Sequence, residues 1–256
     1  MTSSARVRIG HIAIDRFTLA QAVEAVAGLV QAGHGGRVFT PNVDHVVLAE
    51  TNEHFRSAYA RAEVVLADGM PVVWGSRLLG DPLPERVSGA DFVGPLLERA
   101  AQEGWRVYLL GGAPGVAEAT AAILREKPGV AVVGWDDGRI STQPDPERDA
   151  EVAKKIRGAQ AQVLLVALGA PKQELWIDRM ATELGPTVAL GIGASLDFIC
   201  GRVRRSPRWM SQAGLEWLFR LGQEPRRLWR RYLVNDPVFA AILLRSWRSR
   251  PGPRGG

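Results

Sequence analysis

The chain has 256 residues, of which 46% are hydrophobic and 23% are charged, and its formal net charge is +5; this composition excludes a disordered, collagen-like or heptad-repeat protein. The single cysteine, Cys200, excludes an internal disulfide and a multi-cysteine zinc site, and it fits a reducing compartment. No apolar run approaches the ~20 residues that span a bilayer, and the N-terminus lacks the apolar stretch of a signal peptide, so we expect a cytoplasmic protein.

Short apolar segments alternate with stretches of helical periodicity through residues 1–201. The expected strands are 37–40, 63–67, 105–110, 130–134, 162–168 and 187–192, and the expected helices are 44–60, 89–103, 114–126, 147–159 and 171–184. Segments that are apolar without alternation, such as VLLVALG at 163–169, are typical of strands buried on both faces of a parallel sheet. The alternation predicts a doubly wound α/β domain.

Residues 202–256 are expected to form a basic extension of this domain. They hold thirteen arginines against three acidic residues, a charge of +10, which leaves −5 for residues 1–201. Four of the eight tryptophans also lie there. Apolar residues recur every four positions from Trp209 to Leu221, and further helical segments are expected at 226–233 and 238–244.

A basic helix with interleaved tryptophans suits an anionic membrane surface or a polyphosphate substrate. The alternative is that its apolar stripe packs on the body or on a second subunit, which would make a homo-oligomer. No helix-turn-helix, zinc-finger or RNA-binding pattern accompanies the arginines, so we expect no nucleic-acid partner. The extension is therefore predicted to place the protein peripherally on a membrane.

Polar residues and glycines follow the expected strands directly, at the edge of the sheet where α/β proteins bind ligands. The segments are TPNVDH (40–45), ADGMP (67–71), GGAPG (111–115), GAPKQE (169–174) and GIGASLD (191–197). Glycines immediately before a helix favour phosphate, although such turns also need glycine for steric reasons. GxGxxG and GxxxxGK[ST] patterns are absent, which disfavours a dinucleotide enzyme or an NTPase of the usual kind. We expect a nucleotide-type ligand.

In this order, the segments TPNVDH, ADGMP, VSGADF, LLGG, LGAPKQELW and GIGASLDF, followed by the Arg/Trp extension, resemble the WecG/TagA/CpsF family of bacterial glycosyltransferases over roughly residues 10–245. The resemblance implies a Rossmann-like fold. It implies transfer of a sugar, often N-acetylmannosamine, from a UDP donor to an undecaprenyl-diphosphate-linked sugar at the inner face of the cytoplasmic membrane. It also implies inversion at the anomeric carbon, with no required metal or cofactor.

Asp68 is the candidate general base for this reaction. An inverting transfer needs a group that accepts the proton of the acceptor hydroxyl, and a carboxylate at a strand end is held rigidly enough to do so. The ADG context of the resembled family supports this role, whereas the alternative is a cap for a helix that begins near Met70. Asp44 and His45 are a second acid/base possibility, with a helix cap and a structural histidine as their alternatives.

The remaining candidates are expected to bind the donor and orient the substrates. Thr40 and Asn42 would orient a sugar hydroxyl or acetamido group, and Asn42 is otherwise a turn residue. Gln173 would reach the donor with its amide, or else face solvent. Asp197 would accept hydrogen bonds from ribose hydroxyls, or else cap a helix. The other donor-binding candidates are Gly111, Gly112, Gly169, Pro171, Gly191 and Gly193.

Charge on the leaving diphosphate must be balanced by a cation, by helix N-termini or by arginines. The adjacent pair Asp136 and Asp137 is the possible metal-binding motif, but adjacent side chains point apart and Gly138 follows, so the pair is better interpreted as a turn. We therefore predict no metal. The candidate arginines for the diphosphate or the membrane are Arg220, Arg226, Arg227, Arg230 and Arg231.

Overall fold

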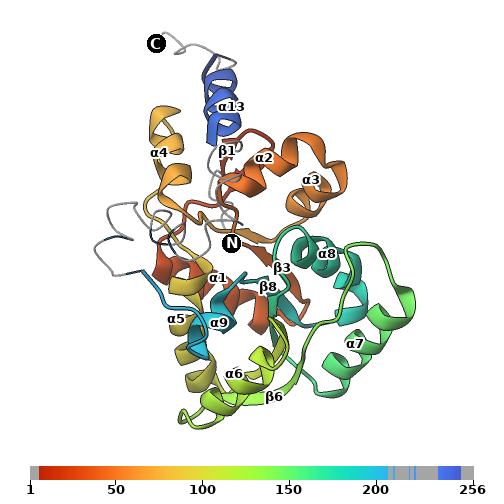
Figure 1. Ribbon diagram of the computed structural model, residues 1–256. Coiled ribbons are helices and arrows are strands. Elements are labelled where there is room, and N and C mark those ends of the chain that lie inside the picture. Colours follow the sequence, from red (N-terminus) through yellow and green to blue (C-terminus); the bar gives the residue numbers. More distant parts are fainter. Residues whose placement is uncertain (1–5, 207–209, 211–218, 220–221, 223–235, 249–256) are drawn as a thin grey trace.

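The computed structural model describes residues 6–206, 210, 219, 222 and 236–248 (Figure 1). Its centre is a six-stranded parallel sheet with the strand order β4-β3-β8-β7-β5-β6. The strands are β3 (Gly36–Phe39), β4 (Val64–Val65), β5 (Arg106–Gly111), β6 (Ala131–Asp136), β7 (Val163–Ala167) and β8 (Val188–Gly191). The predicted doubly wound, Rossmann-like α/β fold is confirmed.

Helices cover both faces of this sheet (Figure 1). One face carries α1 (Leu19–Ala32), α5 (Gly89–Glu103), α6 (Val116–Arg125) and α9 (Ser195–Ile199), and the other carries α2 (Val43–Thr51), α3 (Glu53–Ala60), α7 (Pro146–Gly158) and α8 (Lys172–Leu184). Along β7, Val163 and Leu165 join one hydrophobic cluster while Leu164 and Val166 join the other. Burial on both faces explains why the strands are apolar without alternation.

Several elements differ from the expectation. The structure adds a hairpin of β1 (Val7–Ile9) and β2 (Ile12–Ile14), as well as α1. A further helix, α4 (Met70–Leu78), begins at the position considered for a helix near Met70. Strands of three residues are too short to show a period, which is why the hairpin gave no signal. The expected helix 44–60 is two helices, because the Asn52 side chain accepts the Phe55 N–H at 3.0 Å and starts α3.

The last described helix, α13 (Asp236–Arg248), contains the expected segment 238–244 and contacts the body. Phe239 and Ile242 are buried in the hydrophobic cluster that includes β1 and α2, and Leu243 lies against Gly75 of α4. Arg245 forms an ion pair with Glu50 of α2 at 2.6 Å. The division of the chain at Gly201 stays a prediction.

Across the described residues, every helix is too short or too polar to pass through a lipid bilayer. The expected helical segment 226–233 lies outside the described residues, as do all but Met210 and Phe219 of the segment from Trp209 to Leu221.

Candidate functional site

The loops after β4, β3, β8, β7 and β5 lie side by side, because these strands are neighbours in a parallel sheet. The Asp68 N–H donates to the Pro41 carbonyl at 2.9 Å and joins the loop after β4 to the loop after β3. The Thr40 hydroxyl donates to the Gly191 carbonyl at 3.2 Å and joins the loop after β3 to the end of β8. The residues predicted from separate segments therefore form one edge.

Asp68 is partly exposed at the start of this edge. The N-cap residue of α4 is Gly69, at φ +104°, a conformation that favours glycine. Asp68 therefore lies one residue before the N-cap position, and the alternative that it caps this helix is wrong. Its carboxylate is close enough to the buried Tyr59 to act on it: burial raises the pKa of the Tyr59 phenol well above its usual range, and the charges of Glu174 and Asp68 raise it further.

Asn42 is the N-cap residue of α2, and its side-chain oxygen accepts the Asp44 N–H at 3.0 Å. The cap at this helix is therefore Asn42 rather than Asp44, which lies in the first turn. Thr40, two residues earlier in the loop, is buried. Both side chains expected to orient the substrate already have partners within the protein, and these partners fix where the side chains lie.

His45 is buried at the start of α2 and contacts three elements. Its Nδ1 accepts the Asn42 backbone N–H at 2.9 Å, and its ring stacks on Phe55 of α3 with a centroid separation of 5.7 Å. Its Nε2 lies 3.5 Å from Oε1 of Glu174 in α8. A histidine whose Nδ1 accepts a hydrogen bond carries its proton on Nε2, so this N–H faces the carboxylate.

Gln173 and Glu174 are both buried at the first turn of α8. Gln173 Nε2 donates to Glu174 Oε1 at 2.7 Å, and Gln173 Oε1 accepts the Gly193 N–H at 3.2 Å. The alternative that Gln173 faces solvent is wrong, because the residue is only 2% exposed. Sequence reasoning missed Glu174 as a site residue: a glutamate in a first helical turn is ordinary, and only the tertiary fold buries it.

Gly111 and Gly112 at the end of β5 are required by the local backbone. Gly111 has φ +96°, and a Cβ there would lie 2.9 Å from the Ala167 backbone. Gly112 has φ +87°, and a Cβ there would lie 2.7 Å from the Val116 side chain. Positive φ and close approach are the two reasons for glycine in such turns, and both apply whether or not phosphate binds.

The other donor-binding candidates surround the Gln173 side chain and the start of α8. Gly191 is close enough that a Cβ would lie 3.0 Å from Gln173 Nε2, whereas Gly169 and Gly193 have open space beside the α-carbon. Pro171 is the N-cap residue of α8 and follows a cis peptide bond. The loops after β7 and β8 are therefore brought together, as predicted from their sequences.

Asp197 lies within the short helix α9, whose N-cap residue is Ala194, so the capping alternative for Asp197 is wrong. Arg202 approaches its carboxylate to 4.0 Å.

Arg205 pairs with Asp91, the third residue of α5. Burial alone would raise the pKa of Asp91, but the Ser88 hydroxyl, Arg86 and Arg205 outweigh it and hold that pKa below its usual range. The first residues of the basic extension are thus tied to the site edge.

Asp136 is the last residue of β6, and Asp137 follows it on the same edge. Asp136 accepts the Gly138 N–H at 3.0 Å, which is the predicted turn, and its carboxylate also contacts Arg148 and Lys155. Among the residues that the structure describes, no cluster of three or more His, Cys, Asp or Glu side chains is arranged to hold a metal ion. An open hollow of about 530 Å³ at this strand end is lined by Trp135, Asp136, Asp137, Arg139, Asp145 and Arg148.

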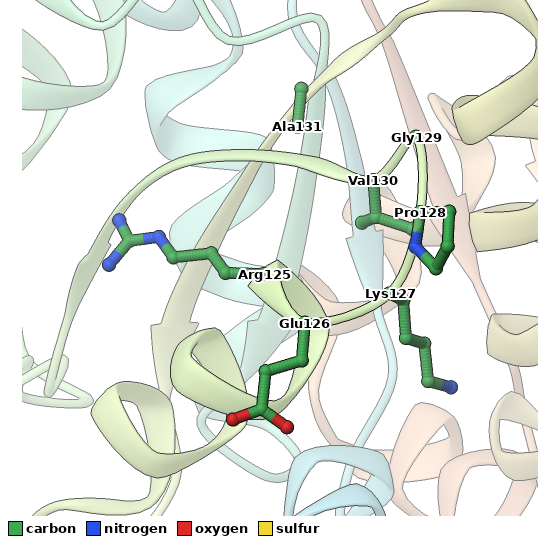
Figure 2. Close-up of a pocket in the computed structure, with 7 residues that line it drawn as sticks. All are labelled: Arg125, Glu126, Lys127, Pro128, Gly129, Val130 and Ala131. Atoms are coloured by element: carbon green, nitrogen blue, oxygen red, sulfur yellow. The ribbon is translucent and has the colours of Figure 1, made fainter.

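A second open hollow of about 400 Å³ lies at the opposite edge of the sheet, along the loop from Arg125 to Ala131 (Figure 2). Figure 2 shows the charged side chains of Arg125, Glu126 and Lys127 pointing in different directions rather than toward a common centre. Compared with the strand ends described above, this hollow is therefore a poor candidate for a ligand site. The five candidate arginines of the extension, Arg220, Arg226, Arg227, Arg230 and Arg231, lie outside the described residues.

Comparison with known proteins identifies the family of this chain. A sequence model described as the glycosyl transferase WecG/TagA/CpsF family matches residues 7–252. The N-acetylglucosaminyldiphosphoundecaprenol N-acetyl-beta-D-mannosaminyltransferase of Bacillus spizizenii is 34% identical over 220 residues, which are 86% of this chain and 82% of that enzyme. This chain therefore belongs to the WecG/TagA/CpsF family of glycosyltransferases.

Proposed function

We propose that the protein transfers an N-acetylmannosamine-like sugar from a UDP donor to a polyprenyl-diphosphate-linked sugar, with inversion, in the synthesis of a cell-surface polysaccharide. The observation that carries this proposal is the likeness, over 86% of the chain, to an enzyme named for N-acetylmannosamine transfer to N-acetylglucosaminyldiphosphoundecaprenol. The single row of strand-end loops offers a place for both substrates.

In the proposed mechanism, Asp68 accepts the proton of the acceptor hydroxyl while that oxygen bonds to the anomeric carbon of the donor sugar. The bond from this carbon to the diphosphate oxygen breaks, and UDP leaves with the electron pair. Attack from the face opposite the leaving group inverts the anomeric carbon. Asp68 is partly exposed and follows the end of a strand, which supports its role. A general base must be accessible to the substrate and must be held in place by the fold.

The other site residues bind and orient the substrates in this proposal. Thr40, Asn42 and Gln173 set the position of the transferred sugar, and Asp197 binds the ribose. The glycine turns after β5, β7 and β8, together with Pro171 at the start of α8, surround the diphosphate, because the positive end of a helix dipole favours an anion. Arginines of the extension complete the charge balance there or bind anionic lipid.

The acceptor's lipid implies work at a membrane surface, so we place the protein peripherally on the inner face of the cytoplasmic membrane. No cofactor is needed beyond the UDP-sugar substrate, and self-association remains compatible with the apolar stripe of the extension.

The decisive experiment incubates the full chain with a panel of UDP-sugars and an N-acetylglucosamine-diphosphate-polyprenyl acceptor, and follows the glycolipid product. We expect transfer from UDP-N-acetylmannosamine. Binding of UDP without transfer from any donor would instead indicate a membrane-tethered nucleotide-binding protein, and turnover without sugar transfer would indicate another nucleotide-dependent enzyme.

Transfer is expected to be independent of divalent cations. The Asp136 carboxylate, which a metal would need, is engaged with Arg148, Lys155 and the Gly138 N–H. The rate in excess EDTA should equal the rate in Mg²⁺ or Mn²⁺, measured on enzyme dialysed against chelator. Loss of activity in EDTA that added Mn²⁺ restores would contradict this and return Asp136 and Asp137 to the site.

A further inference from the structure

Three buried polar atoms near Asp68 have no hydrogen-bond partner among the described residues: His45 Nε2, Tyr59 Oη and Glu174 Oε2. The three residues are 6%, 3% and 0% exposed. Buried polar groups are almost always hydrogen-bonded, so three exceptions in one cluster distinguish this region from the rest of the core. The mechanism proposed above uses none of these side chains.

His45 and Glu174 stand in the middle of a polar chain that joins three loops of the site. The Asn42 N–H donates to His45 Nδ1 at 2.9 Å, and His45 Nε2 faces Glu174 Oε1 at 3.5 Å. Gln173 Nε2 donates to the same carboxylate oxygen at 2.7 Å, and the Gly193 N–H donates to Gln173 Oε1 at 3.2 Å. This chain of polar contacts thus runs from the loop after β3, through α8, to the loop after β8.

The partners in this polar chain fix the direction of the Gln173 amide. A carboxylate accepts hydrogen bonds and an amide NH₂ donates them, so Glu174 requires that Gln173 present its nitrogen. The Gly193 N–H requires that Gln173 present its oxygen on the other side. His45 is fixed in the same way, since its Nδ1 faces a backbone donor and its Nε2 faces the carboxylate.

We propose that His45 and Glu174 are positioning residues of the sugar transfer, which hold Asn42 and Gln173 in the orientation required to bind the substrates. This inference rests on the proposed function. Neither side chain needs to touch the substrate, because each acts through Asn42 or Gln173, to which the proposed function gives that contact. Their burial fits this role, since a supporting contact away from water keeps its geometry between turnovers.

Two substitutions test the proposal with little change in shape. Glu174→Gln keeps the size of the side chain but can donate as well as accept, so the Gln173 amide loses its fixed direction. His45→Phe keeps a ring stacked on Phe55 and leaves the Asn42 N–H without its acceptor. Each is expected to lower kcat by about 10- to 100-fold, the loss that a small misplacement of substrate causes, while KM for the UDP-sugar changes less than about 3-fold.

The double variant Glu174→Gln/His45→Phe is expected to lose little more than the worse single variant, because the two side chains act as one unit. Asp149→Asn is the matched control. Asp149 is also a buried carboxylate against α8, where it accepts the Trp176 N–H at 2.9 Å and Arg179 at 2.9 Å, but it lies outside the polar chain. It should lower Tm and leave kcat unchanged.

Amide hydrogen exchange gives a readout that needs no activity. Peptides covering residues 40–46 and 191–196 should exchange faster in Glu174→Gln than in wild type, and at the wild-type rate in Asp149→Asn. Wild-type kcat and exchange in both site variants, or an equal fall of kcat in Asp149→Asn, would overturn the proposal. If the wild type transferred no sugar, the proposed function would fail, while the exchange comparison would still decide whether Glu174 holds these loops.

Discussion

Asp68→Asn is expected to lower the rate of sugar transfer by about 10²-fold or more, the usual size of the loss when a general base is removed. Asparagine has the same shape but cannot accept the acceptor's proton. UDP binding and Tm should stay close to wild type, because Gly69 is the N-cap residue of α4 and the backbone bond from the Asp68 N–H to Pro41 does not involve the carboxylate.

The measurement is product formation under single turnover, together with UDP affinity by calorimetry. Asp44→Asn is the matched control, since Asp44 is a partly exposed aspartate in a neighbouring loop of the same edge. A normal rate in Asp68→Asn with a slow Asp44→Asn would move the base to Asp44. Loss of UDP binding in Asp68→Asn would make Asp68 a donor ligand instead.

The sequence predicts the strands well because their signal is local. All six expected strands occur, each within two residues of the expected start, and their continuous apolar character follows from burial on both faces. The loops that follow them were predicted to share one edge for the same reason: parallel strands end on the same side. Thr40, Asp68 and Gly191 are indeed neighbours there.

What the sequence could not predict depends on contacts between distant segments. His45 and Glu174 lie far apart in the chain, and their approach exists only because α2 and α8 cover the same face of the sheet. The insertion of β8 between β3 and β7, which brings Gly193 to Gln173, is likewise a property of the sheet order. Periodicity reports which face of an element is apolar and carries no information on which elements are neighbours.

Truncation after Gly201 is expected to leave a folded body that is less stable and binds vesicles less well. It removes none of the six strands of the parallel sheet, but it removes α13, whose Phe239 and Ile242 are buried against the β1 and α2 region. It also removes the +10 charge of residues 202–256. Tm should fall, vesicle binding should drop, and transfer should decrease if an arginine of the extension neutralises the diphosphate.

Two further variants, compared with the truncated chain, separate these effects. A chain that stops after Arg248 keeps α13 and should behave as wild type. Phe239→Ala in the full chain keeps every charge and should cost about 3 kcal/mol of stability, a Tm decrease of roughly 6–12 °C for a domain of this size. Its binding to anionic vesicles at a temperature well below Tm should be unchanged, and in wild type that binding should weaken with salt as charges are screened beyond ~8–10 Å.

The comparison of these proteins with the truncated chain decides whether the arginines of residues 202–256 act in catalysis, in membrane binding or in both. A truncated chain that transfers sugar at the full rate to a soluble acceptor analogue, yet no longer binds vesicles, would restrict the arginines to the membrane. A truncated chain that is slow on the soluble analogue, while Phe239→Ala is not, would show that residues 202–256 serve catalysis by more than the packing of α13. This is the result expected if one or more of their arginines neutralise the diphosphate. Vesicle binding that survives truncation would refute the membrane role of residues 202–256.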